Sequence, residues 1–122
     1  MQSSKPFAIL AFLLIPAFLL VAAGPGFRSR DMLHEHYLKH GREFGAISEQ
    51  QYLRLAQRLR DSRPGRDILE SRRPDGGAAR FDRRRGWFVA YDADGTIRTF
   101  FLPAEGLRYF ELQTRNYGGA PR

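Results

Sequence analysis

The stretch ISEQQYLRLAQRL, residues 47–59, decides how this 122-residue chain folds, because it specifies a helix with a defined start and one apolar face. Ser48 and Gln51 have the spacing of a capping box, in which each side chain binds the backbone N–H of the other residue. The apolar residues that then recur at helical spacing are Tyr52, Leu55, Ala56 and Leu59. The turn-forming residues 63–65 (Arg-Pro-Gly) end the helix.

Another helix is predicted directly before this one. Ser29 can cap a helix that begins near Arg30, and Asp31 falls in its first turn, where a negative charge is favourable. The apolar side of this helix is formed by Met32, Leu33, Tyr37 and Phe44. The glycines at positions 41 and 45 indicate a bent or frayed end.

The second half of the chain changes from a helical period to a period of two. Residues 66–79 show little pattern, and we interpret them as a loop with room for one short strand. Strands are predicted at residues 80–82, 87–91 and 96–101, separated by turns at 83–86 and 92–95. The sequence DADG at 92–95 contains part of a calcium loop, but the other ligands do not follow it, so we interpret it as a hairpin turn.

The predicted fold class is therefore α+β, with two N-terminal helices packed on a small antiparallel β-sheet. In its last strand Ile97, Thr99 and Phe101 share one face. If Ile97 and Phe101 face the helices, the Thr99 hydroxyl does so too. Pro103 closes the strand, residues 104–112 fit either a short helix or one more strand, and residues 116–122 read as a loose tail.

The first 23 residues differ from the rest. A short polar start with Lys5 leads into a 17-residue apolar run, 7–23, that ends in small residues. This layout is typical of a secretory signal peptide cleaved after Ala23, and a retained membrane anchor is the alternative. We expect residues 24–122 to form a single domain that is exported to the periplasm or secreted, or else held at a membrane by the N-terminal segment. Residues 24–26 would be a flexible mature N-terminus.

The domain that remains is basic and contains no cysteine. Without residues 1–23 it has 19 basic and 13 acidic side chains, a net charge of +6, and Lys39 is its single lysine. An arginine-rich surface suits nucleic acid or another polyanion, and a GC-rich genome would give the same composition without any such partner. The lack of cysteine excludes disulfides and thiolate metal sites.

One group of polar residues suggests chemistry. His36, Lys39, His40 and Glu43 are spaced three and four apart, so they share one side of a helix. A nuclease that works without metal needs such a set: an acid, a base, and a cation that faces the phosphate. Two other readings are open. The residues can be an ordinary solvated helix face, or His36, His40 and Glu43 can be metal ligands, although Lys39 would repel a cation.

These residues also carry a resemblance to a known family. The chain resembles the metal-independent ribonuclease toxins of the barnase, EndoU, colicin and RelE superfamily (BECR), particularly the colicin D-like tRNases. The resemblance lies in His36-x-x-Lys39-His40-Gly41-x-Glu43-Phe44-Gly45, in Ser48 and residues 52–56, and in Asp94-Gly95-x-Ile97-x-Thr99-x-Phe101-x-Pro103.

The resemblance implies a BECR-like domain with its active site where the first helix meets the last strands. By that resemblance His40 would be the general acid or base, Lys39 the phosphate-stabilising cation and Thr99 a phosphate-binding hydroxyl. His36 is a further catalytic candidate. The residues expected to contact substrate are Arg98, Phe101 and Glu43.

The function expected on these grounds is a secreted endoribonuclease, with a toxin role as one form of it and tRNA as one candidate RNA. It would need no cofactor and no metal. The resemblance implies a partner as well, an acidic immunity protein, and a membrane would be involved only if residues 1–23 are retained. The alternative is a noncatalytic basic module that binds nucleic acid or an anionic envelope surface.

Overall fold

The computed structural model describes residues 24–118, so the predictions for residues 1–23 and 119–122 lie outside the described residues. The described helices are α2 (Arg30–His40), the short 3-10 helix η1 (Gly41–Phe44), α3 (Glu49–Asp61) and α4 (Leu107–Tyr117). The described strands are β1 (Ile68–Arg72), β2 (Ala78–Asp82), β3 (Trp87–Tyr91) and β4 (Ile97–Phe101). None of these helices is both long and apolar enough to cross a membrane.

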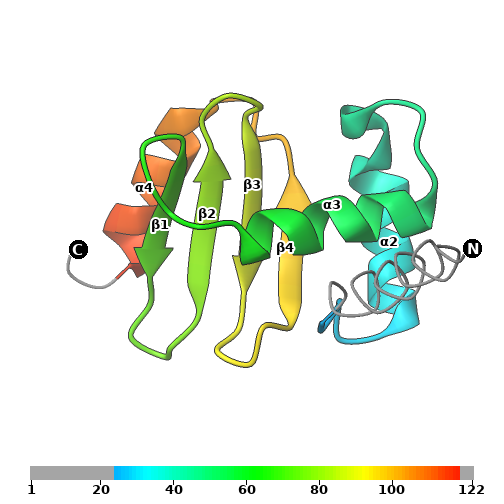
Figure 1. Ribbon diagram of the computed structural model, residues 1–122, viewed down its shortest axis with the longest axis horizontal. Coiled ribbons are helices and arrows are strands. Elements are labelled where there is room, and N and C mark those ends of the chain that lie inside the picture. Colours follow the sequence, from blue (N-terminus) through cyan, green and yellow to red (C-terminus); the bar gives the residue numbers. More distant parts are fainter. Residues whose placement is uncertain (1–23, 119–122) are drawn as a thin grey trace, which may run out of the picture.

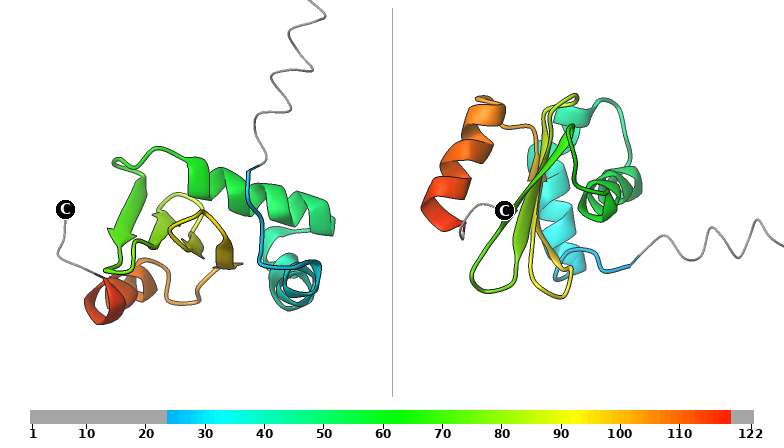
Figure 2. Two further views of the ribbon diagram at one scale, coloured as in Figure 1. Left: turned by 90° about the horizontal axis from the view of Figure 1, so that it is seen from below. Right: turned by 60° about the vertical axis from the view of Figure 1, so that its left-hand side comes forward.

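The strands form one antiparallel sheet in the order β1-β2-β3-β4, which confirms the predicted meander. Helix α3 crosses one face of the sheet and α4 covers the other (Figures 1 and 2). Helix α2 stands beside the edge strand β4, and the two run in the same direction (Figure 1). The chain is therefore α+β as expected, with one more helix and one more strand than the sequence firmly predicted.

The larger core lies between α3 and the sheet. Tyr52, Ala56 and Leu59 of α3 are buried against Val89 and Phe100. The Tyr52 hydroxyl donates a hydrogen bond to the Phe100 carbonyl. Burial raises the pKa of Tyr52 above its ordinary value, because ionisation would place a charge in this apolar layer, and the negative charge of Glu43 raises it further. Tyr52 therefore stays neutral inside the fold.

Both predicted helix starts are confirmed. The Ser29 hydroxyl accepts a hydrogen bond from the Met32 N–H at 3.1 Å. At α3 the capping box is complete: the Ser48 hydroxyl accepts from the Gln51 N–H at 3.1 Å, and the Gln51 side chain accepts from the Ser48 N–H at 2.7 Å. The start of α3 is thus fixed by local hydrogen bonds, as its sequence predicts.

Two ambiguous segments are resolved. Residues 66–79, interpreted as a loop, contain the five-residue strand β1, which pairs with β2. Residues 104–112 belong in part to α4, which extends to Tyr117 and buries Phe110 against Phe81. Residues 116 and 117, which were expected to belong to a loose tail, are therefore helical. Helix α4 also covers the sheet face that the two-helix prediction left open.

The prediction that Ile97, Thr99 and Phe101 share one face is wrong. The register shifts between β3 and β4, so Tyr91 pairs with Ile97 but Ala90 pairs with Thr99. The extra residue, Arg98, is a bulge, and a bulge reverses the alternation of the side chains that follow. Ile97 consequently faces α3, whereas Phe101 joins the cluster under α4.

The prediction of a flexible segment at residues 24–26 is also wrong. The Gln57 side-chain amide donates to the carbonyls of Gly24 and Pro25 at 3.3 and 3.2 Å. The Arg60 guanidinium also donates to the Pro25 carbonyl. The Ile97 N–H donates to the Gly26 carbonyl at 2.9 Å. This segment is therefore held against α3 and the start of β4.

Replacing Tyr52 with phenylalanine should lower the free energy of unfolding by about 1–2 kcal/mol near neutral pH, because the buried Phe100 carbonyl loses its partner. Above about pH 10 the difference in free energy of unfolding between the variant and the wild type should narrow. In the wild type, Tyr52 ionises there only when the chain is unfolded, and this ionisation favours the unfolded state. The variant has no hydroxyl at this position and loses nothing. Urea denaturation across pH measures both effects. Tyr117→Phe, at a side chain that is 59% exposed, should change little. If the difference in free energy of unfolding stayed the same at high pH, Tyr52 would not be the buried, neutral hydroxyl described above.

Candidate active site

The centre of the candidate site is a pair of side chains, His40 at the end of α2 and Glu43 in η1. The His40 Nδ1 lies 2.8 Å from the Glu43 Oε2. An ionised carboxylate only accepts hydrogen bonds, so Nδ1 carries the hydrogen in this pair. The lone pair of the neutral imidazole is then on Nε2. The three-residue spacing that suggested neighbouring side chains is thus realised across the junction of α2 and η1.

Glu43 is itself held by the sheet. Its other oxygen, Oε1, accepts a hydrogen bond from the Leu102 N–H at 2.8 Å, just after β4. Both oxygens of the carboxylate are therefore engaged within the protein. Glu43 was expected to contact substrate, and its geometry instead supports His40. Sequence reasoning missed Leu102, because this contact joins residues 59 apart and uses a backbone group that carries no residue-type signal.

Two rings, those of Phe101 and His36, lie close to the imidazole of His40. Its ring centroid lies 5.1 Å from that of Phe101 and 6.3 Å from that of His36. The Phe101 ring also contacts Phe88 and Tyr109, which hold it in place beside His40. Only 18% of the His40 side chain is exposed. The predicted meeting of the first helix with the last strand is therefore observed between His40 and Phe101.

His36 lies one helical turn before His40. Its Nδ1 lies 2.9 Å from the Met32 carbonyl, which can only accept, so Nδ1 carries the hydrogen here as well. The His36 ring is tilted against Phe27, with centroids 5.0 Å apart. The two histidines thus each hold Nδ1 in an internal hydrogen bond and leave Nε2 for other partners.

Lys39 and Thr99 are positioned less tightly. Lys39 is exposed and forms no ion pair with any residue of the described range 24–118. Thr99 lies two residues before Phe101 on β4 and pairs with Ala90. The side chains of Thr99 and Phe101 therefore share the α4 side of the sheet. Helix α2 contacts β4, but among the described residues the Thr99 side chain forms no hydrogen bond with His36, Lys39 or His40.

Arg98 does not join this group. It is the bulged residue of β4, and its guanidinium lies 3.5 Å from the Asp92 carboxylate in the β3–β4 turn. The turn itself forms as a hairpin turn: the Asp94 carboxylate accepts from the Thr96 N–H at 2.9 Å, and this bond lowers the pKa of Asp94. The side chain of Arg98 is thus held at the start of β4, the end of the strand that is farther from His40.

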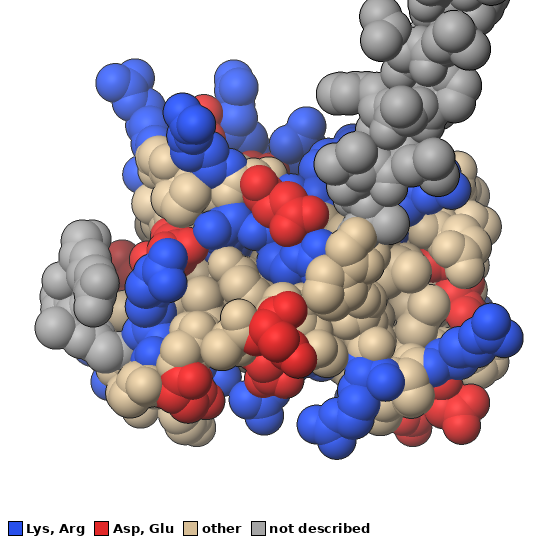
Figure 3. All heavy atoms as spheres, turned by 60° about the horizontal axis from the view of Figure 1, so that its bottom comes forward, with Lys and Arg blue, Asp and Glu red and all other residues tan. Residues whose placement is uncertain are grey.

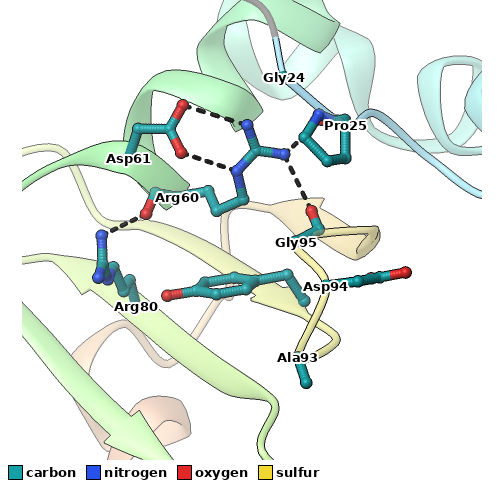
Figure 4. Close-up of a pocket in the computed structure, with 9 residues that line it drawn as sticks. Gly24, Pro25, Arg60, Asp61, Arg80, Ala93, Asp94 and Gly95 are labelled. Carbon is teal, nitrogen blue, oxygen red and sulfur yellow. Dashed lines mark hydrogen bonds and ion pairs between the residues drawn. The ribbon is translucent and has the colours of Figure 1, made fainter.

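A separate pocket of about 400 Å³ lies at that far end (Figure 4). The Arg60 guanidinium contacts Asp61 on one side, at 2.9 Å, and the carbonyls of Pro25 and Gly95 on the other. The neighbouring Arg80 guanidinium pairs with Glu70 at 2.7 Å and donates to the Arg60 carbonyl. These arginines hold residues 24–25, the end of α3 and the sheet together. None of the predicted site residues lines this pocket.

The metal alternative has little support in this arrangement. Within residues 24–118, no three side chains of His, Asp or Glu converge in a way that could hold a metal ion. In the set that was considered, His36 binds a backbone carbonyl and His40 binds Glu43. Glu43 is also occupied by Leu102.

Comparison of the chain with protein-family models and with curated proteins finds no match. The function therefore has to be argued from the side chains and their geometry.

Exchanging Glu43 for glutamine should invert the tautomer of His40. The amide oxygen of Glu43→Gln can still accept from the Leu102 N–H, and its NH₂ group then donates to His40 Nδ1, which leaves the imidazole hydrogen on Nε2. Nitrogen-15 chemical shifts of the neutral histidines report this directly. His34, which pairs with Glu49 at 2.8 Å, is the internal control and should not change. Unaltered His40 shifts in the variant would refute the assigned pair.

Proposed function

We propose that this protein is a metal-independent endoribonuclease in which His40 transfers the proton. The observation that carries the proposal is the chain from the Leu102 N–H through Glu43 to His40 Nδ1. A general acid or base works best when a third group fixes its orientation and tautomer. Glu43 supplies that group and leaves His40 Nε2 as the reactive atom. The resemblance to BECR ribonuclease toxins supports the same role for this histidine.

The proposed reaction is attack of a ribose 2′-hydroxyl on its own 3′-phosphate. His40 Nε2 removes the 2′-hydroxyl proton, or returns a proton to the leaving 5′-oxygen, so the products are a 2′,3′-cyclic phosphate and a free 5′-hydroxyl. His36, one turn away with its own Nε2 available, is the weaker candidate for the opposite transfer, which water can also perform. Such a step gains roughly 10²- to 10⁴-fold in rate from a well-placed acid or base.

Charge develops on the phosphate oxygens in the transition state, and a cation and a hydroxyl close to them stabilise it. Lys39 has a long flexible stem beside His40, and its ammonium has no competing ion pair within the described residues. Thr99 lies on β4, the strand that α2 contacts. We assign Lys39 as the phosphate-binding cation, Thr99 as a hydroxyl donor and Phe101 as the wall of the site. Arg98 has no part in this proposal, since it pairs with Asp92.

The proposal includes the biological setting expected from the sequence: an exported ribonuclease that acts as a toxin on RNA, with an acidic immunity protein that covers the basic site. A noncatalytic basic module is the competing function. That function requires the same positive charge but no proton transfer by His40. A measurement of RNA cleavage therefore distinguishes the ribonuclease from the noncatalytic module.

His40→Ala should lower RNA cleavage by roughly 10²- to 10⁴-fold, because the proton transfer is lost, while His36→Ala should cost clearly less. Residues 24–122 contain every described element and are used for all variants. Cyclic-phosphate product from tRNA and from total RNA is measured in EDTA, together with RNA affinity and thermal melting. RNA affinity should stay near the wild-type value, since binding depends on arginine contacts rather than on the imidazole. The melting temperature of His40→Ala should fall but leave the protein folded, because this mostly buried ring packs on Phe101 and pairs with Glu43.

Three outcomes decide against the proposal. If the wild-type protein binds RNA in EDTA but leaves it intact, the noncatalytic module is correct. If cleavage needs an added metal and disappears with chelator, the metal-dependent reading returns. Equal cleavage by His40→Ala and the wild type would remove His40 from the mechanism.

Glu43→Gln tests the role of the carboxylate separately. Because the amide keeps the bond to Leu102 but presents the wrong tautomer of His40, we expect melting close to the wild type and cleavage reduced by roughly 10²-fold or more. Glu49→Gln makes the same change next to His34 and should leave cleavage intact. Full activity of the Glu43 variant would reduce this residue to a structural contact.

A further inference from the structure

A second group of side chains lies at the same end of the sheet as His40. Arg83 and Arg84 form the exposed tip of the β2–β3 turn, and Arg66 is exposed in the loop that precedes β1. The Arg83 N–H donates to the Asp67 carbonyl at 2.8 Å, so the two loops are joined. We call Arg66, Arg83 and Arg84 the arginine rim.

The rim differs from Arg85, the third arginine of the β2–β3 turn, whose guanidinium is paired. Arg85 pairs with the buried Asp82 at 2.9 Å and lies over the Trp87 ring at 5.1 Å. Asp82 also accepts from the backbone N–H groups of Arg84 and Arg85. Its carboxylate therefore fixes the shape of the turn. The side chains of the rim form no ion pair with any residue of the described range, although the carboxylate of Asp67 is exposed in the neighbouring loop.

The rim and the candidate site are joined by packed rings. Trp87, directly after the turn, lies 5.5 Å from Phe44, measured between ring centroids. Phe44 stacks on Phe100 at 4.4 Å and directly follows Glu43, the partner of His40. Because β2 ends and β4 ends at the same side of an antiparallel sheet, the turn and the site share one end of the molecule (Figure 1).

The opposite end of the sheet has another character. Its two turns contain Asp75, Asp92 and Asp94, together with Arg73. The view with this end turned forward shows Asp and Glu interleaved with Lys and Arg (Figure 3). The β2–β3 turn on the His40 side therefore carries arginines that are unpaired within the described range, whereas the two turns at the opposite end are rich in aspartate, although Asp67 and Glu105 are exposed in loops at the His40 end.

We infer that the arginine rim binds the phosphates of a single RNA strand whose reacting phosphate lies at His40. This inference rests on the proposed function, since it takes RNA as the substrate. Guanidinium groups grip phosphate oxygens in a bidentate way, and unpaired arginines at a turn can do so without first breaking an ion pair. The rim would thus set the direction in which the RNA strand leaves the site.

The test measures binding without cleavage. A 2′-O-methyl oligonucleotide has no free 2′-hydroxyl, so it cannot react by the proposed route. Its affinity for residues 24–122 is measured by fluorescence anisotropy between about 50 and 300 mM salt. Arg83→Gln/Arg84→Gln is compared with Arg28→Gln/Arg30→Gln, which removes the same charge from exposed residues at the start of α2, away from His40. Arg85 is left intact because it holds Asp82.

The rim variant should lose roughly tenfold in affinity at low salt, and the slope of log affinity against log salt should become shallower by about 1–1.5, as expected for two lost phosphate contacts. The control should keep most of its affinity and slope. For cleavable RNA, the rim variant should raise KM and leave kcat near the wild type. Thermal melting of both variants should stay close to the wild type, since these side chains are exposed.

An equal loss of affinity in both variants would overturn the inference, because binding would then depend on net charge alone. So would an unchanged salt slope in the rim variant. If phosphatidylglycerol vesicles bind to the rim and the oligonucleotide does not, the surface is a membrane contact and the inference is wrong. A wild type that binds through the rim but never cleaves refutes the proposed function and leaves the rim assignment standing.

Discussion

The hydrogen bond from the buried Tyr52 hydroxyl to the Phe100 carbonyl is the interaction on which the rest of the structure depends. It fixes α3 to the edge strand β4 inside the apolar layer, where both residues are fully buried. The Tyr52 ring also contacts the rings of Phe27, Tyr37 and Phe44. These three residues belong to the N-terminal segment, α2 and η1. One side chain therefore aligns every element that carries a candidate catalytic residue.

This arrangement explains how a small domain without disulfides can hold a polar site at its edge. Phe44 is packed between Tyr52, Trp87 and Phe100, so η1 cannot move away from the sheet without breaking aromatic contacts. Glu43, directly before it, is thereby held beside Leu102 and His40. The nearby charge of Glu43 also raises the pKa of Tyr52. The apolar layer and the polar pair are thus parts of one structure rather than independent features.

The sequence predicted those parts of the fold that are determined locally. The capping box of α3, the Ser29 cap and the turns of the meander depend on residues a few positions apart, and the structure confirms them. Strand β1 and helix α4 were left as alternatives, a loop with room for a short strand and a helix or strand, because each is stabilised by distant partners: β1 by pairing with β2, and α4 by burial of Phe110 on Phe81. The bulge at Arg98 leaves no pattern in the sequence, and it alone reversed the predicted facing of Phe101.

In the candidate site, too, the local contacts could be predicted from the sequence and the long-range contacts could not. The spacing of His40 and Glu43 was sufficient to predict that they are neighbours, whereas the bond from Leu102 depends on tertiary structure. That bond also changes how Glu43 is understood. An edge strand leaves backbone N–H groups without partners, and such groups invite pairing with another chain. One oxygen of Glu43 satisfies the N–H that follows β4, and the other fixes His40. The carboxylate therefore stabilises the end of the sheet and also orients the imidazole. Glutamine at position 43 can still accept the hydrogen bond from Leu102 but cannot hold His40 in the same tautomer. Alanine can do neither, so the two substitutions separate the two roles.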